Sequence, residues 1–170
     1  MPVKLQDTPE AIAWLALFTE SDALTAKLLL NSLRLISADY FDYSIKKLIL
    51  AMADKCDGPI ALYAAREVEP DCEYFPDKRK RPVVVEGQPG SEGQLGYTVT
   101  QVTRSDPSRF LNHPPIATLK KKRCRHIVIV DDIVGSGNRI KRFMKSMRKE
   151  RSLYSWISFG WVKFHVVAFA

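Results

Sequence analysis

Two adjacent carboxylates followed by a glycine-rich loop are the residues of this 170-residue chain best suited to chemistry. Asp131 and Asp132 come directly after the apolar run 127–130, and the loop Gly135-Ser136-Gly137-Asn138-Arg139 begins three positions after Asp132. We expect both glycines to take positive φ and to let the backbone approach a ligand closely. Successive N–H groups at the start of a helix favour an anion, and the serine and asparagine side chains add neutral donors. The loop is therefore a predicted phosphate site.

Carboxylates beside a phosphate loop require a ligand that suits both, because like charges repel. Ring hydroxyls of an attached sugar can donate hydrogen bonds to carboxylates, and such charge-assisted bonds are roughly twice as strong as neutral ones. A sugar 5-phosphate with free ring hydroxyls satisfies both requirements. The sequence therefore predicts a sugar-phosphate ligand.

Three other nucleotide or phosphate sites begin with a similar strand, and the residues exclude each of them. A Walker A loop needs GxxxxGK[ST], which the chain lacks. A dinucleotide fingerprint needs a third glycine, but Ile140 follows the loop instead. A response-regulator receiver needs a later phosphoacceptor aspartate, and no aspartate follows Asp132.

The elements around this loop predict an α/β fold with a mainly parallel sheet flanked by helices. The β-branched run 127–130 is typical of a strand covered on both faces. Apolar residues from Ile140 to Met147 predict a helix, and 161–169 predicts a further strand, so the order strand, helix, strand indicates a parallel pair. An earlier buried strand is expected at 60–64.

The chain is expected to form one domain over residues 1–170, with a helical part at 8–55 and an α/β part at 59–170. Ser21 is the predicted N-cap of a second helix. In the proline-rich middle we expect a short strand at 83–85 and a helix over Leu95–Val102. The sequence leaves open whether the chain is a fragment of a longer protein.

Composition narrows the class of protein. The chain is 46% hydrophobic and 26% charged, which excludes a disordered chain. No apolar run approaches the roughly 20 residues of a membrane span, and the N-terminus does not have the pattern of a secretory signal. Three scattered cysteines and three scattered histidines indicate reduced thiols in a cytoplasmic protein and no metal site among those residues.

A net charge of +7 makes an anionic partner plausible. Basic residues crowd the helix after the loop and form a run at 120–125. Such a surface either keeps the chain solvated or contacts nucleic acid, and both interpretations stay open. Arg139 stands at the helix start, where the helix dipole disfavours a cation, so a phosphate partner is expected for it.

The segment Asp131–Gly137 resembles the motif with which type I phosphoribosyltransferases bind phosphoribosyl pyrophosphate (PRPP). The resemblance implies an α/β fold in which the acidic pair holds the ribose hydroxyls and the loop holds the 5-phosphate. It also implies Mg²⁺ bound with PRPP, which Asp131 and Asp132 contact indirectly, through ribose hydroxyls or water.

A second segment fits the same family. Its pyrophosphate loop follows an earlier strand, and here Ala65-Arg66-Glu67 follows the strand expected at 60–64. Together with 90–93, this segment is similar to divergent phosphoribosyltransferase-like domains of bacterial conflict and phage-defence systems. Two positions depart from the family: Arg139 stands where a threonine usually ends the loop, and Gly135 stands where purine-salvage enzymes have a catalytic acid.

The sequence thus predicts a phosphoribosyltransferase-like domain that binds PRPP or a related ribose 5-phosphate. One hypothesis is an enzyme that transfers the phosphoribosyl group and releases pyrophosphate. The alternative is a non-catalytic ligand sensor or nucleic-acid-binding module on the same fold. No acceptor substrate or catalytic residue is identified, and a homodimer or larger assembly is compatible with the sequence.

Overall fold

The structure is a computed structural model that describes residues 5–34, 36–69, 71–82 and 91–170. Contacts group the chain into two compact units, residues 1–37 and 38–170. In the first unit a short 3₁₀ helix (Leu5–Asp7) precedes α1 (Pro9–Leu15) and α2 (Glu20–Ser32). Thr8 caps α1 by accepting a hydrogen bond from the backbone N–H of Ala11.

The second unit is built on a four-stranded, all-parallel sheet, which confirms the α/β prediction. The strands are β1 (Ile60–Ala64), β2 (Phe110–Asn112), β3 (His126–Asp131) and β4 (Lys163–Ala168), in the spatial order β2-β1-β3-β4. All five residues of β1 and all of β3 except its first are buried. Burial of both strand faces is what their continuous apolar sequence predicts.

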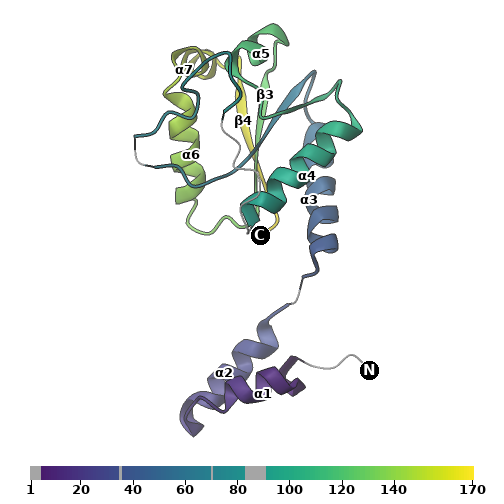
Figure 1. Cartoon of the computed structure of the whole chain (residues 1–170), viewed down its shortest axis with the longest axis vertical. Helices are drawn as coiled ribbons and strands as arrows, with labels where there is room; N and C mark the ends of the chain where they lie inside the picture. The colour runs from purple at the N-terminus through teal and green to yellow at the C-terminus, as the bar shows by residue number, and fades with distance from the viewer. Residues whose placement is uncertain (1–4, 35, 70, 83–90) are drawn as a thin grey trace. The chain divides into compact units, whose positions relative to one another are not determined.

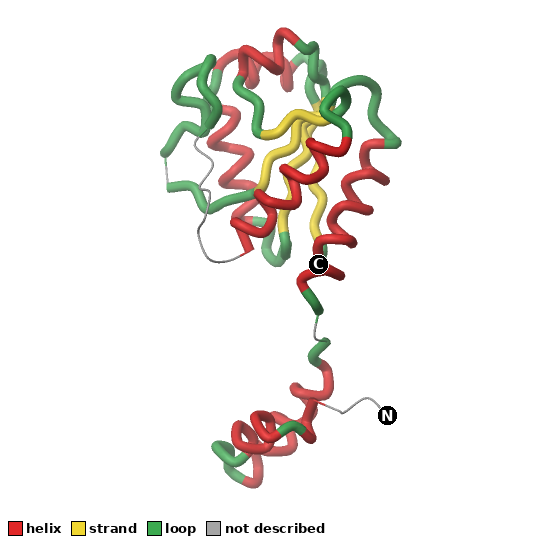
Figure 2. Tube along the Cα trace, turned by 45° about the vertical axis from the view of Figure 1, so that its right-hand side comes forward, coloured by secondary structure: helices red, strands yellow, loops and turns green. Residues whose placement is uncertain are grey.

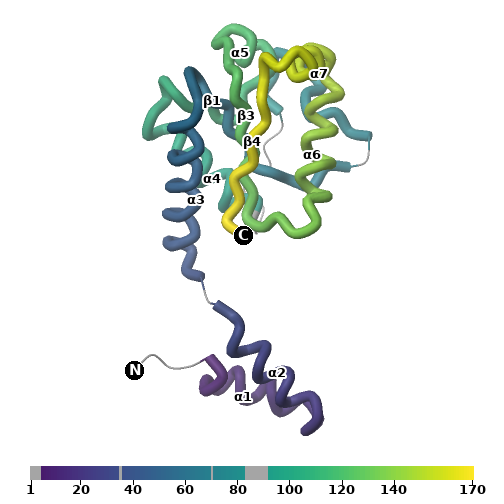
Figure 3. Tube along the Cα trace, turned by 180° about the vertical axis from the view of Figure 1, so that it is seen from behind, coloured from purple at the N-terminus to yellow at the C-terminus, as the bar shows by residue number. Residues whose placement is uncertain are grey.

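Helices cover both faces of this sheet (Figures 1 and 3). On one face lie α3 (Ala38–Ala53) and α4 (Ser91–Ser105), whose apolar residues form one core cluster with Val128 and Val130. On the other face α6 (Asn138–Arg148) and α7 (Arg151–Ser158) form a second cluster with Ile127 and Ile129, and the short helix α5 (Ile116–Lys121) joins that cluster. Figure 2 shows the strands running between these layers.

Most elements expected from the sequence are present. The helices at 8–55, the strands at 60–64 and 127–130 and the helix over Leu95–Val102 are confirmed. The expected cap of α2 is wrong, because the helix begins at Glu20 with Thr19 as its N-cap, which places Ser21 in the first turn. The strand expected at 83–85 lies outside the described residues. No helix in the described part of the chain is long and apolar enough to cross a membrane.

His113, which follows β2, fixes the carboxyl edge of the sheet. Its Nε2 accepts a hydrogen bond from the backbone N–H of Ala64 at 3.0 Å, and its Nδ1 lies 2.5 Å from Oδ1 of Asn112. Accepting through Nε2 requires a neutral ring with its proton on Nδ1. Burial, together with the positive charges of Arg66 and Arg81, lowers the pKa of His113 to about 4. The ring therefore acts as a neutral link between β2 and β1.

This neutral link predicts a loss of stability in acid. The pKa is lower in the folded chain than in the unfolded one, so stability is complete above pH 6.5 and declines as pH falls toward 4. We expect the wild type to lose about 3 kcal/mol more than His113→Gln across this window, because glutamine does not titrate. Urea unfolding at pH 7 and pH 4 measures the difference. Equal declines in both proteins would contradict the assignment.

Candidate functional site

The two sequence segments expected to bind ligand lie side by side at one edge of the sheet. β2 lies on one side of β1 and β3 on the other, so the strand order reverses between β1 and β3. In open α/β sheets such a reversal opens a crevice at the carboxyl ends of the strands, where ligands bind. Ala64 pairs with Val130, and the backbone N–H of Ala65 donates to the carbonyl of Val130 at 2.7 Å. The segments 65–67 and 131–139 therefore start from adjacent strand ends.

The loop after β3 is held by its own first residues and by the end of β4. Asp132 uses its backbone carbonyl to accept from the N–H groups of Phe169 and Ala170, at 3.1 and 3.2 Å. Val134 donates its N–H to the carbonyl of Ala170 at 2.7 Å. These bonds fix the two apolar residues between the acidic pair and the glycines. The loop and the last residues of β4 lie at the same end of the second unit in Figure 3.

Gly137 makes the turn into α6. Its φ is 73°, a left-handed conformation that glycine adopts without strain, and it is the N-cap of the helix. The expected positive φ of Gly135 is wrong, because only Gly137 has that conformation in this loop. A methyl group added at either glycine would meet no atom within 4 Å. Open space beside this backbone is what close approach of a ligand requires.

The same loop presents backbone donors. Within the described residues, the N–H groups of Gly135, Ser136 and Gly137 have no hydrogen-bond acceptor. The N–H of Asn138 points toward Oγ of Ser136 at 3.4 Å. Gly135, Ser136 and Asn138 are exposed. Unpaired N–H groups at the positive end of a helix of 11 residues can bind an anion.

Arg139 joins the two carboxylates, although the sequence indicated a phosphate partner for it. Its Nη2 donates to Oδ1 of Asp131 and, at 2.5 Å, to Oδ1 of Asp132, while its Nε donates to Oδ2 of Asp131 at 3.2 Å. The helix start directs this side chain back over the strand end, a geometry that residue spacing does not reveal. The guanidinium reduces the negative charge that would repel a phosphate in the loop.

Asp131 is the most buried member of this cluster, with no exposed surface. Burial and, to a smaller extent, the hydrogen bond with Asp132 raise its pKa to about 6 against the opposing charge of Arg139. Burial lowers the pKa of Arg139, but Asp132 and Asp131 outweigh it and leave the pKa above its ordinary value. Asp132 is more accessible, with 20% of its side chain exposed, and so is the better placed of the two carboxylates to meet a ligand.

Arg66 and Glu67 complete the edge beside β1. The guanidinium carbon of Arg66 lies 4.9 Å from the ring centre of Tyr74, and this cation–π contact helps to position the Arg66 side chain. The backbone N–H of Glu67 donates to a carboxylate oxygen of Glu92 at 3.0 Å, which joins this segment to the start of α4. Ala65 is buried and contributes backbone only. Of the segment 90–93, Gly90 lies outside the described residues.

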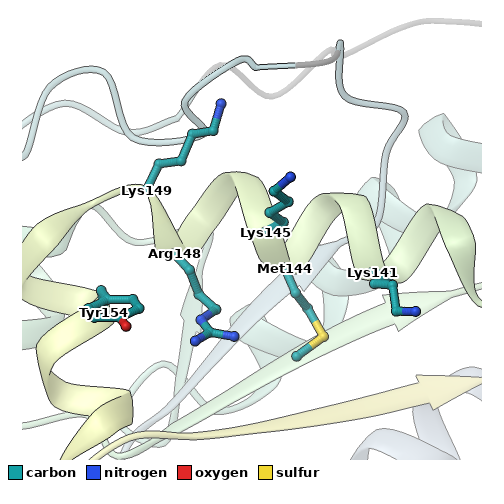
Figure 4. Close-up of a pocket in the computed structure, with 6 residues that line it drawn as sticks. All are labelled: Lys141, Met144, Lys145, Arg148, Lys149 and Tyr154. Carbon is teal, nitrogen blue, oxygen red and sulfur yellow. The ribbon is translucent and has the colours of Figure 1, made fainter.

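The basic residues of α6 line a pocket of about 480 Å³ (Figure 4). Four cations and two other side chains surround it: Lys141, Met144, Lys145, Arg148, Lys149 and Tyr154. Tyr154 comes from α7, and the guanidinium carbon of Arg148 lies 5.4 Å from its ring centre. This pocket extends along α6 from Lys141, in its first turn, to Lys149, just after its last residue.

Comparison with known proteins gives one match. Residues 11–170 match the family model described as PRTase-CE. No curated protein and no solved structure gives a significant match. The matched range includes both segments at the carboxyl edge of the sheet.

Proposed function

This chain belongs to the PRTase-CE family, a family of phosphoribosyltransferase type, and we propose that it binds PRPP or a related ribose 5-phosphate where β1 and β3 end. The observation that carries the proposal is the convergence of two segments on one edge, the acidic pair with its loop and the segment 65–67. The 5-phosphate accepts from the loop N–H groups, and the ribose hydroxyls donate to Asp132 and Asp131.

In this proposal the Arg139 side chain can contact either the acidic pair or the bound phosphate. It pairs with both carboxylates in the structure, and it stands at the start of the helix that the phosphate approaches. Ribose hydroxyls can replace its hydrogen bonds to the more accessible Asp132, and the guanidinium then stays close to the phosphate. The guanidinium thus offsets the negative charge of the carboxylates when ligand is absent and that of the phosphate when ligand is bound.

Mg²⁺ fits the donor set, because it prefers oxygen ligands and is usually held by one or two carboxylates together with waters and substrate phosphates. Asp131 and Asp132 already accept hydrogen bonds from Arg139, which favours an indirect contact through ribose hydroxyls or water. When bound, the ion neutralises charge on the pyrophosphate.

Transfer of the phosphoribosyl group would proceed by departure of pyrophosphate from the anomeric carbon, through a state with oxocarbenium character. Arg66, the middle residue of the segment 65–67, would stabilise the departing pyrophosphate electrostatically. Among the described residues, no general base for an acceptor is identified, so the chemistry proposed for this chain ends at the donor side. A sensor of PRPP would use the same contacts without an acceptor.

Calorimetric titration tests this proposal. We expect PRPP with Mg²⁺ to bind more tightly than ribose 5-phosphate, because only PRPP reaches the segment 65–67, and ATP to bind most weakly. Release of pyrophosphate on adding candidate acceptors separates the enzyme from the sensor. Equal heats for all three ligands would contradict a ribose-phosphate site.

The resemblance to conflict-system domains extends the proposal to phage defence, in the cytoplasm. All three cysteines are free thiols, which suits that compartment. A plating assay of phage on cells that carry the wild type or Asp132→Asn tests the role. Protection that survives loss of PRPP binding would separate defence from this ligand.

Nucleic-acid binding is the second candidate function, and the cationic pocket along α6 favours it. We expect weak, sequence-independent binding whose log K falls with log salt by about 0.9 for each phosphate neutralised on duplex DNA. Replacing Lys145, Arg148 and Lys149 together by glutamine should lower that slope by about 2 to 3 and leave PRPP binding unchanged. Fluorescence anisotropy at several salt concentrations measures the slope.

The matched control removes three lysines from another surface of the same unit: Lys46, Lys47 and Lys55. This variant carries the same change in net charge but keeps the pocket. Equal slopes for the two triple variants would assign the binding to net charge, and no binding at about 50 mM salt would remove this function.

A further inference from the structure

The structure brings together three residues that are far apart in the sequence: Cys56, His126 and His165. The sulfur of Cys56 and one ring nitrogen of each histidine all lie within 4.8 Å of one another. Nδ1 of His126 lies 3.0 Å from Nε2 of His165. Two of the three histidines that the sequence shows only as scattered residues therefore lie beside a cysteine in the fold.

The sheet explains why these residues meet. His126 is the first residue of β3, and its side chain lies on the same face as Val128, two residues later. His165 is paired with Val128 in the register of β3 and β4, so both histidines lie on that face. The helix α3 covers this face, and Cys56 follows its last turn, with its N–H bonded to the carbonyl of Ala53 at 2.9 Å.

We propose that Cys56, His126 and His165 form a zinc site at the amino end of the sheet. Zinc binds cysteine sulfur at about 2.3 Å and histidine nitrogen at about 2.0–2.1 Å in a tetrahedron, which places donor atoms about 3.3–3.7 Å apart. The donors here are within about an ångström of that separation. The fourth position is left to water, and mixed nitrogen and sulfur donors suit zinc better than Mg²⁺ or Ca²⁺.

The surroundings of the cluster are compatible with a bound cation. Cys56 is buried and both histidines are half-buried, so the donors are held by packing. Asp57 contributes a negative charge, and Arg109, Arg125 and Lys163 contribute positive ones. A thiolate and the Asp57 carboxylate would match the two positive charges of zinc, and the three basic side chains would remain as further cations near the site.

The site would connect the end of α3 to β3 and β4, at the opposite end of β3 from the acidic pair. Ligand bound only to the folded chain stabilises it. We therefore expect zinc at about 100 times its Kd to raise the melting temperature by about 5–10 °C.

Cobalt titration of the reduced, tag-free chain tests the site. We expect one equivalent of Co²⁺ to give thiolate-to-cobalt charge-transfer absorption and visible bands of tetrahedral cobalt, both abolished by zinc. Cys56→Ser should lose the charge-transfer absorption, and His165→Gln should keep the thiol but bind at least about 10-fold more weakly. Cys72→Ser, which removes an exposed thiol elsewhere, is the matched control and should behave as the wild type.

Two further measurements keep the test decisive if a variant folds poorly. Melting of the metal-free variants shows whether the fold survives, and X-ray absorption of the zinc-loaded wild type should show one sulfur and two imidazole donors. Absence of stoichiometric absorption, the same absorption in Cys56→Ser, or a donor set without sulfur would overturn the proposal.

Discussion

Gly137→Val is expected to weaken PRPP binding by at least about 100-fold while the sheet still forms. Gly137 has a φ of 73°, which a β-branched residue cannot adopt without strain. Relief of that strain would turn the N–H groups of the loop away from the phosphate. Loss of two hydrogen bonds to a charged group costs about 3 kcal/mol or more, which is the stated factor in affinity. Calorimetric titration with PRPP and Mg²⁺ measures it.

Gly160→Val is the matched control for this strain. Gly160 has a φ of 69°, its added side chain would also meet open space, and it lies between α7 and β4. Both variants should lose about 1–3 kcal/mol of stability, but only Gly137→Val should lose the ligand. Gly135→Ala adds a side chain in the loop where φ is not positive, and it separates steric exclusion from strain. Undiminished affinity in a folded Gly137→Val protein would exclude this loop as the phosphate site.

Asp132→Asn should discriminate between ligands. An asparagine keeps the shape but loses the charge that strengthens hydrogen bonds from ribose hydroxyls. We expect binding of PRPP and ribose 5-phosphate to weaken about 10- to 100-fold, while inorganic phosphate, which uses the loop alone, changes little. Competition binding with the three ligands measures the ratio.

The substitution at Asp132 also alters a contact within the protein, because Asp132 accepts a hydrogen bond from Arg139 in the structure. A control variant is therefore needed. The control variant Glu67→Gln removes one carboxylate at the same edge, on a side chain that is exposed and pairs only distantly with Arg142, at 3.9 Å. It should leave the ratio between ribose 5-phosphate and inorganic phosphate unchanged, because neither of these ligands carries the pyrophosphate that is proposed to reach the segment 65–67. Parallel losses for all ligands in Asp132→Asn would make the acidic pair structural.

Local sequence pattern predicted the elements that deliver the site. The β-branched run before Asp131 and the apolar spacing from Ile140 to Met147 each specify their element within a few residues, since buried strands and amphipathic helices differ in period. Of the two glycines predicted to take positive φ in the turn between them, Gly137 does so and Gly135 does not. Two short elements were not predicted. β2 has three residues, too few to show a period, and α7 begins at Arg151 after the N-cap Glu150, with no glycine or proline beside it to mark a boundary.

Two side-chain contacts were not predicted from the sequence either. Neither the pairing of Arg139 with the carboxylates nor the meeting of His126 with His165 follows from spacing. The Arg139 contact depends on the path of the loop between β3 and α6, and the histidine contact depends on which strand is the neighbour of β3 and on how far one is shifted along the other. A single sequence does not specify the register between two neighbouring strands. Once the parallel sheet has formed, that register determines the neighbours of every residue in both strands.

The place of β3 inside the sheet has a consequence for motion. It is paired along its length with both β1 and β4, so opening it requires breaking ladders on two sides. Its amide hydrogens should therefore exchange with solvent almost as slowly as global unfolding permits, while those of the exposed loop exchange quickly. The carboxylates thus follow a strand whose amide hydrogens exchange slowly, and the phosphate donors lie in a loop whose amide hydrogens exchange quickly. Only a few residues separate the two regions.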